Sequence, residues 1–244
     1  GVRFMEFKLD VHSHTIASGH AFGTVSEMAA AAAESGFELF GITEHAKGIP
    51  GTCTDIYFKN LRVLPRQLYG IEMMFGSEIN IIDYNGRLSL DNELMEEFLD
   101  IRIAGIHELC YKIGDEEQNT AAYLGAMKHP LVDIISHPDD GRIPINYEAL
   151  VLGAKETKTL LEVNNSSLCP ESFRDNAREN YFMMLDLCRK HNVPVIVNSD
   201  AHTPYAVGDL NQAKALLSEV DFPEELVVNR SVKAFKEALS NKRN

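Results

Sequence analysis

The chain has 244 residues, 45% of them hydrophobic, so it is long enough to bury one large core, and we expect a single domain spanning residues 1–244. Its net charge of −13 disfavours nucleic-acid binding, which needs clustered Lys and Arg. The chain has no uninterrupted run of about 18 apolar residues, the length that a membrane helix needs. The four cysteines are scattered and the N-terminus lacks a signal-peptide pattern, so we expect a cytoplasmic protein without a disulfide framework.

Short apolar runs rich in β-branched residues recur along the chain, and none alternates strictly between polar and apolar residues. This is the pattern of parallel strands buried on both faces. The runs cover residues 7–11, 39–43, 73–79, 101–106, 132–136, 160–163 and 194–198. Helical patterns lie between or after them, at 26–35, 174–190 and 231–239. This alternation predicts an α/β fold.

The dipeptide Asn85-Gly86 separates two short runs, 79–83 and 87–90. Asn-Gly is typical of a type I′ turn between antiparallel strands. We therefore expect a small β-hairpin excursion within residues 79–90.

Polar side chains able to bind metal ions follow every predicted strand. They are His12 and His14, Glu44 and His45, Glu78 and Asn80, His107, His137, Asn164 and Asn165, and Asp200 and His202. In a barrel all carboxyl ends of the strands open onto one face, so these side chains would meet there. The sequence thus favours a seven-stranded (β/α)7 TIM-like barrel over an open sheet.

Histidines are concentrated at these strand ends. The chain has nine, yet five of the seven strand exits carry one, whereas His129 and His191 are expected to be ordinary surface residues. His12 and His14 are two residues apart, so both side chains of an extended strand point the same way and can reach one ion. Neutral imidazole together with carboxylate suits zinc, manganese or iron better than calcium or magnesium.

Asp200 and His202 repeat this two-residue spacing after the last strand. The first and last strands of a closed barrel are neighbours, so this pair should converge with the first histidine pair. Glu78 ends another apolar strand, and a carboxylate leaving a buried strand is costly unless a cation meets it. A position between two metal ions would meet that need.

These residues resemble the motifs of the polymerase and histidinol phosphatase (PHP) family, in particular its stand-alone bacterial phosphatases. The matching motifs, in order, are His12-Ser13-His14, His20, Thr43-Glu44-His45, Glu78, His107, Ser136-His137-Pro138 and Ser199-Asp200-Ala201-His202. The resemblance implies a distorted seven-stranded barrel with three divalent ions, usually zinc, and manganese or iron remain open. Glu44 stands where the family motif often has Asp, and we expect it to support the neighbouring ligand His45.

The resemblance also distributes the ligands among the three ions. It implies His12, His14, Glu78 and Asp200 for the first ion, Glu78, His107 and His137 for the second, and His20, His45 and His202 for the third. The implied activity is that of a phosphatase acting on small phosphomonoesters, with a metal-bound hydroxide as nucleophile. Asp200, Glu78 and His202 are the expected catalytic residues.

A phosphate ester also needs hydrogen-bond donors for the oxygens that the ions leave free. Arg142 is the leading candidate because it follows the strand end at His137, and Lys47 and Asn165 follow two other strand ends. Arg62 and Arg66, on the next predicted helix, are further candidates.

Two other functions stay open on the sequence. An amidohydrolase-like enzyme that cleaves C–N bonds would also use an HxH motif, but it typically bridges its metals with a modified Lys at a strand end, and no predicted strand ends in Lys. A noncatalytic metal-binding module would close its coordination shells, whereas nine ligands for three ions leave open positions. The acidic charge disfavours an exonuclease, and the sequence leaves a homo-oligomer open.

Overall fold

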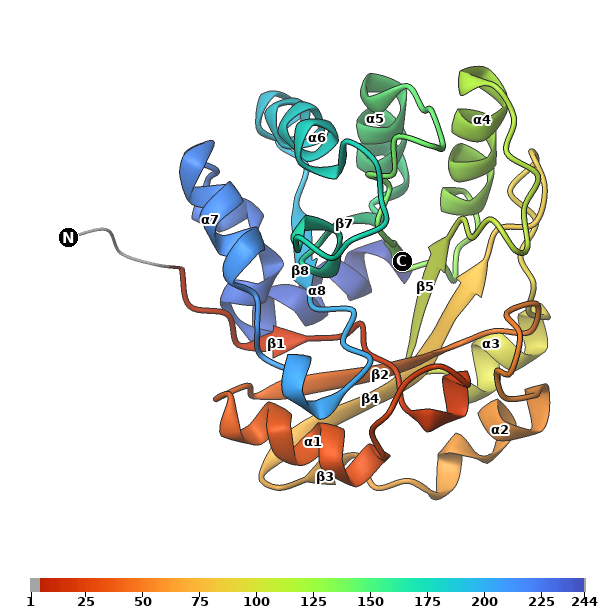
Figure 1. The fold of residues 1–244 in the computed structure, drawn as a ribbon, viewed down its shortest axis with the longest axis vertical. Coiled ribbons are helices and arrows are strands. Elements are labelled where there is room, and N and C mark those ends of the chain that lie inside the picture. Colours follow the sequence, from red (N-terminus) through yellow and green to blue (C-terminus); the bar gives the residue numbers. More distant parts are fainter. Residues whose placement is uncertain (1–4, 244) are drawn as a thin grey trace.

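The computed structural model describes residues 5–243. The first four residues of the N-terminal segment, in which the sequence shows no signal-peptide pattern, lie outside the described part. Within this part, a parallel sheet curls into a nearly closed barrel of seven strands, with helices on its outside (Figure 1). In spatial order the strands are β1 (Leu9–Asp10), β2 (Leu39–His45), β4 (Ile71–Asn80), β5 (Ile101–Gly105), β6 (Ile134–Ile135), β7 (Leu160–Asn164) and β8 (Val195–Asn198). The predicted TIM-like barrel is confirmed, and the short β3 (Gln67–Leu68) adds an antiparallel edge to β4.

Helices follow most of the strands along the chain. They are α1 (Val25–Glu34), α2 (Asp55–Asn60), α3 (Asn92–Phe98), α4 (Glu116–Met127), α5 (Tyr147–Thr157), α6 (Ala177–His191), α7 (Asn211–Glu219) and α8 (Val232–Arg243). Thr24 and Glu27 form a capping box that starts α1. Across residues 5–243 no helix combines the length and apolarity that a membrane crossing requires.

A predicted helix and a predicted turn differ from the structure. The helix expected at 174–190 begins only at Ala177, because Asn176 adopts a left-handed conformation (φ 52°) that interrupts the helical path. Around Asn85-Gly86, a single antiparallel bridge joins Ile81 and Leu88. A type I′ turn needs a positive φ at both central residues. Gly86 has a φ of 80° but Asn85 has no positive φ, so the predicted type I′ turn is wrong.

The barrel is filled at one end by apolar side chains and at the other by polar ones. Inward-facing residues from the starts of the strands pack against Phe235 and Leu239 of α8, which covers that end. A larger apolar layer lies between the sheet and the surrounding helices. The polar groups of the site therefore gather at the carboxyl ends of the strands, opposite α8.

The junction between β1 and β8 is closed mainly by side chains. At the site end, Ser13 and Ala201 form a parallel bridge, and the His14 N–H donates to the Ala201 carbonyl at 2.8 Å. At the other end the buried Asn229 side chain lies between the two strands. Its Nδ2 donates to the carbonyls of Leu9 (2.9 Å) and Val197 (2.7 Å), and its Oδ1 accepts the Val197 N–H (2.7 Å).

We expect Asn229→Ala to lower the free energy of unfolding by about 3 kcal/mol, because it leaves three buried backbone groups unpaired at roughly 1–3 kcal/mol each. Urea unfolding of the variant measures this loss. Asn60→Ala is the matched control, since Asn60 is exposed and its side chain makes no capping hydrogen bond. Equal stability of the two variants would show that Asn229 does not hold the barrel closed.

Candidate metal centre

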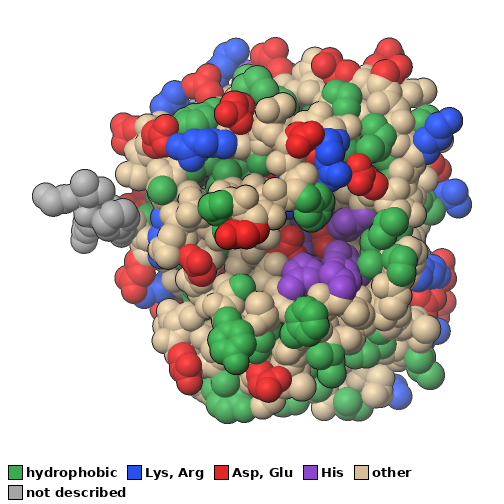
Figure 2. Space-filling model, in the orientation of Figure 1, with side chains coloured by type: hydrophobic (Ala, Val, Ile, Leu, Met, Phe, Trp, Pro, Cys, Tyr) green, Lys and Arg blue, Asp and Glu red, His purple; other side chains and the backbone are tan. Residues whose placement is uncertain are grey.

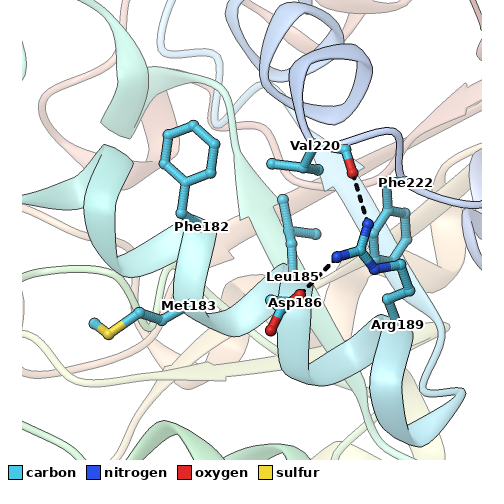
Figure 3. Close-up of a pocket in the computed structure, with 7 residues that line it drawn as sticks. All are labelled: Phe182, Met183, Leu185, Asp186, Arg189, Val220 and Phe222. Carbon is cyan, nitrogen blue, oxygen red and sulfur yellow. Dashed lines mark hydrogen bonds and ion pairs between the residues drawn. The ribbon is translucent and has the colours of Figure 1, made fainter.

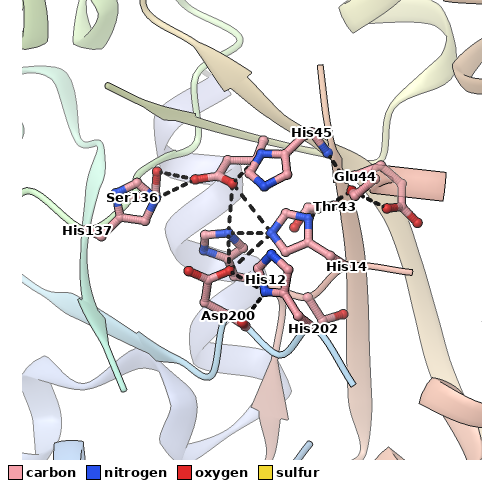
Figure 4. A network of polar contacts seen from close by, with 12 residues as sticks. His12, His14, Thr43, Glu44, His45, Ser136, His137, Asp200 and His202 are labelled. Atoms are coloured by element: carbon pink, nitrogen blue, oxygen red, sulfur yellow. Dashed lines mark hydrogen bonds and ion pairs between the residues drawn. The ribbon is translucent and has the colours of Figure 1, made fainter. Parts of the chain in front are cut away.

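The nine predicted ligands converge at the carboxyl ends of the strands. Figure 4 shows most of them pointing toward one another, and Figure 2 shows the histidines at the bottom of a hollow in the surface. His12 and His14 follow β1, His45 ends β2, and Glu78 lies near the end of β4. His107, His137 and Asp200 each come two residues after a strand. The convergence inferred from strand ends is thus present in the structure.

Glu78 lies at the centre, and its two carboxylate oxygens face different groups of histidines. Oε2 lies 3.2 Å from His12 Nε2 and 3.1 Å from His45 Nδ1. Oε1 lies 2.6 Å from His137 Nε2 and 3.2 Å from His107 Nε2. A carboxylate with one oxygen on each side can bridge two ions, which is the arrangement expected for Glu78.

The pairs after the first and last strands meet beside Glu78. His12 Nε2 and His14 Nε2 are 3.2 Å apart, and Asp200 Oδ1 lies 3.1 Å from His14 Nε2 and 3.4 Å from His12 Nε2. Both imidazoles and the carboxylate can therefore reach one point. The Ser13–Ala201 bridge produces this meeting, because it fixes the register between the two segments.

The remaining histidines form a more exposed group at the mouth of the site. His20 Nε2 and His202 Nε2 are 3.2 Å apart, and the rings of His20 and His45 stack with centroids 5.0 Å apart. Ligand atoms of His14, His45 and His202 also lie within 4.8 Å of one another. The third ligand set implied by the resemblance is therefore brought together, although His14 borders it as well.

The chemistry of these side chains fits bound cations. Three buried atoms, His45 Nδ1, Glu78 Oε2 and Asp200 Oδ1, have no hydrogen-bond partner among the described residues. Leaving such atoms unpaired is costly, and a metal ion would satisfy all three. Burial, together with His45 and His202, lowers the pKa of His14 well below its usual value, which favours the neutral imidazole that binds metals. Burial opposes ionisation of Glu78, but the facing imidazoles, His12 first, hold its pKa well below the usual range.

Two predicted ligands adopt left-handed backbone conformations after their strands end. His137 has φ 30° and Asp200 has φ 54°. Such conformations are uncommon for residues other than Gly, Asn and Asp, and they cluster at functional sites. His137 Nε2 lies 2.6 Å from Glu78 Oε1, and Asp200 Oδ1 lies 3.1 Å from His14 Nε2.

Sequence reasoning missed Glu162, a buried carboxylate in β7 that contacts two predicted ligands. Its Oε1 lies 2.7 Å from His12 Nδ1, and its Oε2 accepts the His137 N–H at 2.8 Å. A carboxylate bonded to Nδ1 fixes the tautomer that directs Nε2 at a metal. The signal was present, because Glu162 interrupts an apolar strand just as Glu78 does.

Glu44 and Asn80 support other ligands from the same layer. Glu44 accepts hydrogen bonds from the Thr15 N–H and the Ser18 hydroxyl, and Ser18 Oγ lies 3.1 Å from His14 Nδ1. Ser18 Oγ also accepts the His45 N–H at 3.0 Å, so Glu44 supports both His14 and His45 through Ser18. Asn80 Oδ1 lies 2.8 Å from His107 Nδ1 and orients that ring.

Above the cluster is a cavity of about 650 Å³, which Arg142 and Asn165 line as predicted. The Asn165 Oδ1 is already bonded to the Ala213 N–H. Lys47 does not line the cavity. Its ammonium pairs with Asp55 at 3.0 Å on the outer surface. Arg62 and Arg66 do not line it either, and Arg66 pairs with Asp100.

The cavity wall includes a second arginine, Arg174, that the helix predicted at 174–190 had concealed. It precedes α6, and its Nη1 donates to Ser167 Oγ at 2.5 Å. Arg142 instead has both edges of its guanidinium engaged, by Asp140 and by Glu108. Arg174 therefore has more donors free for a ligand.

The histidines outside the cluster and the other large cavity carry no comparable chemistry. His129 bonds Asn92 and His191 lies near Glu148, both away from the site. A cavity of about 450 Å³ next to α6, shown in Figure 3, contains Arg189 bonded to Asp186 and to the Val220 carbonyl. Its charged groups are already paired, so the cavity above the histidine cluster is the functional candidate.

We expect Glu162→Gln to weaken metal binding by about 10- to 100-fold, the usual cost of losing a carboxylate behind a histidine ligand. Metal content after dialysis against graded chelator concentrations measures the change. Glu156→Gln, an exposed change on α5, is the control. If Glu162→Gln retains metal as well as the control does, Glu162 has no role in metal binding.

The comparisons with known proteins agree with this geometry. A family model described as the PHP domain matches residues 10–241. A probable phosphatase of Clostridium novyi is 42% identical over 98% of this chain and 96% of its own length, and one of Acetivibrio thermocellus is 40% identical over 98% of both. The fold is similar to that of histidinol phosphate phosphatase from Lactococcus lactis, whose structure was solved with zinc, L-histidinol and phosphate. The two structures have a TM-score of 0.61 and 16% sequence identity, and the match covers 88% of this chain and 94% of that one. The chain belongs to the PHP domain family.

Proposed function

We propose that this protein is a metal-dependent phosphatase that hydrolyses small phosphomonoesters. The observation that carries the proposal is the buried Glu78, which faces five imidazoles at the floor of a cavity walled by two arginines. The relatives named probable phosphatases support it, as does the related fold solved with zinc and phosphate. A purely structural metal site would be closed, whereas this one opens into a cavity of ligand size.

We assign three divalent ions to the cluster, with zinc favoured and manganese or iron as alternatives. The proposed ligands are His12, His14, Glu78 and Asp200 for one ion, Glu78, His107 and His137 for a second, and His20, His45 and His202 for a third. When bound, the ions would polarise the phosphoryl oxygens and acidify a water molecule. Glu78 would hold two of them at a fixed separation.

Asp200 is the proposed proton acceptor. Burial opposes ionisation of its carboxyl, but His12, together with His14 and His202, holds its pKa well below the usual range, so the group is a carboxylate at neutral pH. Asn164 Nδ2 donates to its Oδ2 at 3.1 Å, which leaves Oδ1 directed at His12 and His14. His202, at the mouth, completes the proposed catalytic group with Asp200 and Glu78.

The arginines would bind the phosphoryl oxygens that face the cavity. Arg174 is the stronger candidate because most of its guanidinium donors have no partner among residues 5–243, while Arg142 is held by Asp140 and Glu108. A planar guanidinium binds phosphate with two parallel hydrogen bonds. Asn165 borders the same wall and is proposed to contact the substrate.

Removing the metals should lower the melting temperature by about 10 °C. A ligand present at 1,000 times its Kd stabilises the native state by about 4 kcal/mol, and each kcal/mol corresponds to roughly 2–4 °C in a chain of this size. Calorimetry before and after chelation, with zinc or manganese restored, measures the shift. An unchanged melting temperature would contradict a site whose buried carboxylates need cations.

Asp200→Ala should reduce phosphate release from phosphomonoesters by about 1,000-fold or more, because it removes both a metal ligand and the proton acceptor. Phosphate release by zinc- or manganese-loaded protein is the measurement, with metal content determined in parallel. Asp186→Ala, on the exposed face of α6, is the control. Near-wild-type turnover in Asp200→Ala would exclude Asp200 from the reaction.

A further inference from the structure

The cavity above the metal centre is larger than a phosphoryl group needs, and its outer part is apolar. Its volume of about 650 Å³ falls in the range of roughly 300–1,000 Å³ typical of small-molecule sites. The apolar side chains that line it are Ile49, Ile106, Leu109, Ile143, Phe173 and Ala206. The part of a substrate that leaves with the ester oxygen would lie against them.

Two of these side chains are exposed to an unusual degree for large apolar residues at a ligand cavity. Leu109 is 73% exposed and Phe173 is 72% exposed. Leu109 lies in the turn that starts at His107, where the Cys110 N–H donates to the His107 carbonyl. Its position is therefore tied to that of a proposed ligand.

Phe173 is held in place by the arginines of the cavity wall. The guanidinium carbons of Arg142 and Arg174 lie 5.1 and 5.6 Å from the centre of its ring. Arg142 also pairs with Glu108, the residue next to Leu109, at 3.1 Å. A chain of contacts thus joins Leu109 to Phe173 around the mouth, and an ordered apolar rim of this kind can bind a flat ligand.

The charges around this rim disfavour a second anionic group on the substrate. Apart from the proposed metal ligands, the lining includes four carboxylates, Glu108, Asp140, Glu171 and Asp209, against the two guanidiniums. Asp140 and Glu108 are paired with Arg142, whereas no ion pair involves Glu171 or Asp209 among the described residues. A second anionic group on the substrate would therefore meet more carboxylates than guanidiniums at this rim.

We propose that this rim is a leaving-group subsite that selects phosphomonoesters of uncharged aromatic alcohols. The inference rests on the proposed phosphatase function and specifies its substrate class. In the reaction, water forms a bond to phosphorus, the bond between phosphorus and the alcohol oxygen breaks, and that oxygen takes up a proton. The products are the aromatic alcohol, which Leu109 and Phe173 contact, and inorganic phosphate.

The test compares 2-phenylethyl phosphate with ethyl phosphate on the metal-loaded protein. Both release a primary alcohol of similar acidity, so a difference in kcat/KM reports contacts with the ring and not intrinsic reactivity. We expect kcat/KM to be about 10-fold or more higher for the phenylethyl ester, since apolar contacts of this size give discrimination of that order. A carboxylate at the para position of the ring should reduce kcat/KM severalfold.

Leu109→Ser should reduce this preference to about twofold, because the ratio of the two kcat/KM values isolates the contact between Leu109 and the ring. Ile56→Ser is the matched control, since Ile56 is 74% exposed but lies at another surface pocket, beside Lys47. The control should keep the full preference.

Four results would overturn the proposed subsite. Equal kcat/KM for the two esters in the wild type would refute it and leave the phosphatase function standing. If Leu109→Ser retains the preference for the phenylethyl ester, the exposed rim does not bind the leaving group. If Leu109→Ser changes only the association state of the protein, the rim is a contact between protein chains. No hydrolysis of either ester by the metal-loaded protein would refute the phosphatase function, and the subsite with it.

Discussion

The position of Glu78 is the constraint on which the rest of the site depends. Its carboxylate is fully buried, and one of its oxygens has no hydrogen-bond partner within residues 5–243. A buried, uncompensated charge costs several kcal/mol, so cations between the imidazoles would stabilise this arrangement. Gly105 leaves room for the Ser136 hydroxyl that donates to Glu78 Oε1 at 2.9 Å, since a Cβ on Gly105 would lie 2.2 Å from Ser136 Oγ.

Much of the fold and the ligand set could be predicted because both depend on where buried strands end. Apolar runs located the seven strands, and the two-residue spacings of His12 with His14 and of Asp200 with His202 determined which way those side chains point. The sequence predicted β1 over residues 7–11, but the strand covers only Leu9–Asp10. Side chains interrupt its ladder, because the Val11 N–H donates to Asn198 Oδ1 and the His12 N–H to Asp10 Oδ1.

The residues that sequence reasoning placed poorly are those whose positions depend on loops. Lys47 and Arg142 both follow strand ends, yet Lys47 turns outward to Asp55 while Arg142 borders the cavity. No periodicity distinguishes the two cases, because the direction of a loop is set by tertiary contacts. Arg174 was assigned to a helix because its neighbours have helical spacing, and only the left-handed Asn176 frees it to line the cavity.

The charge of the protein couples the proposed metals to the substrate. The chain carries a net charge of −13, and Glu78, Asp200 and Glu162 place three carboxylates within or directly behind the cluster. With neutral imidazoles, that cluster alone would repel a phosphate dianion, and two guanidiniums on the wall offset only part of the repulsion. Bound divalent ions reverse the local sign. Anionic substrates should therefore bind only after the metals, because the ions would outweigh the carboxylates of the cluster.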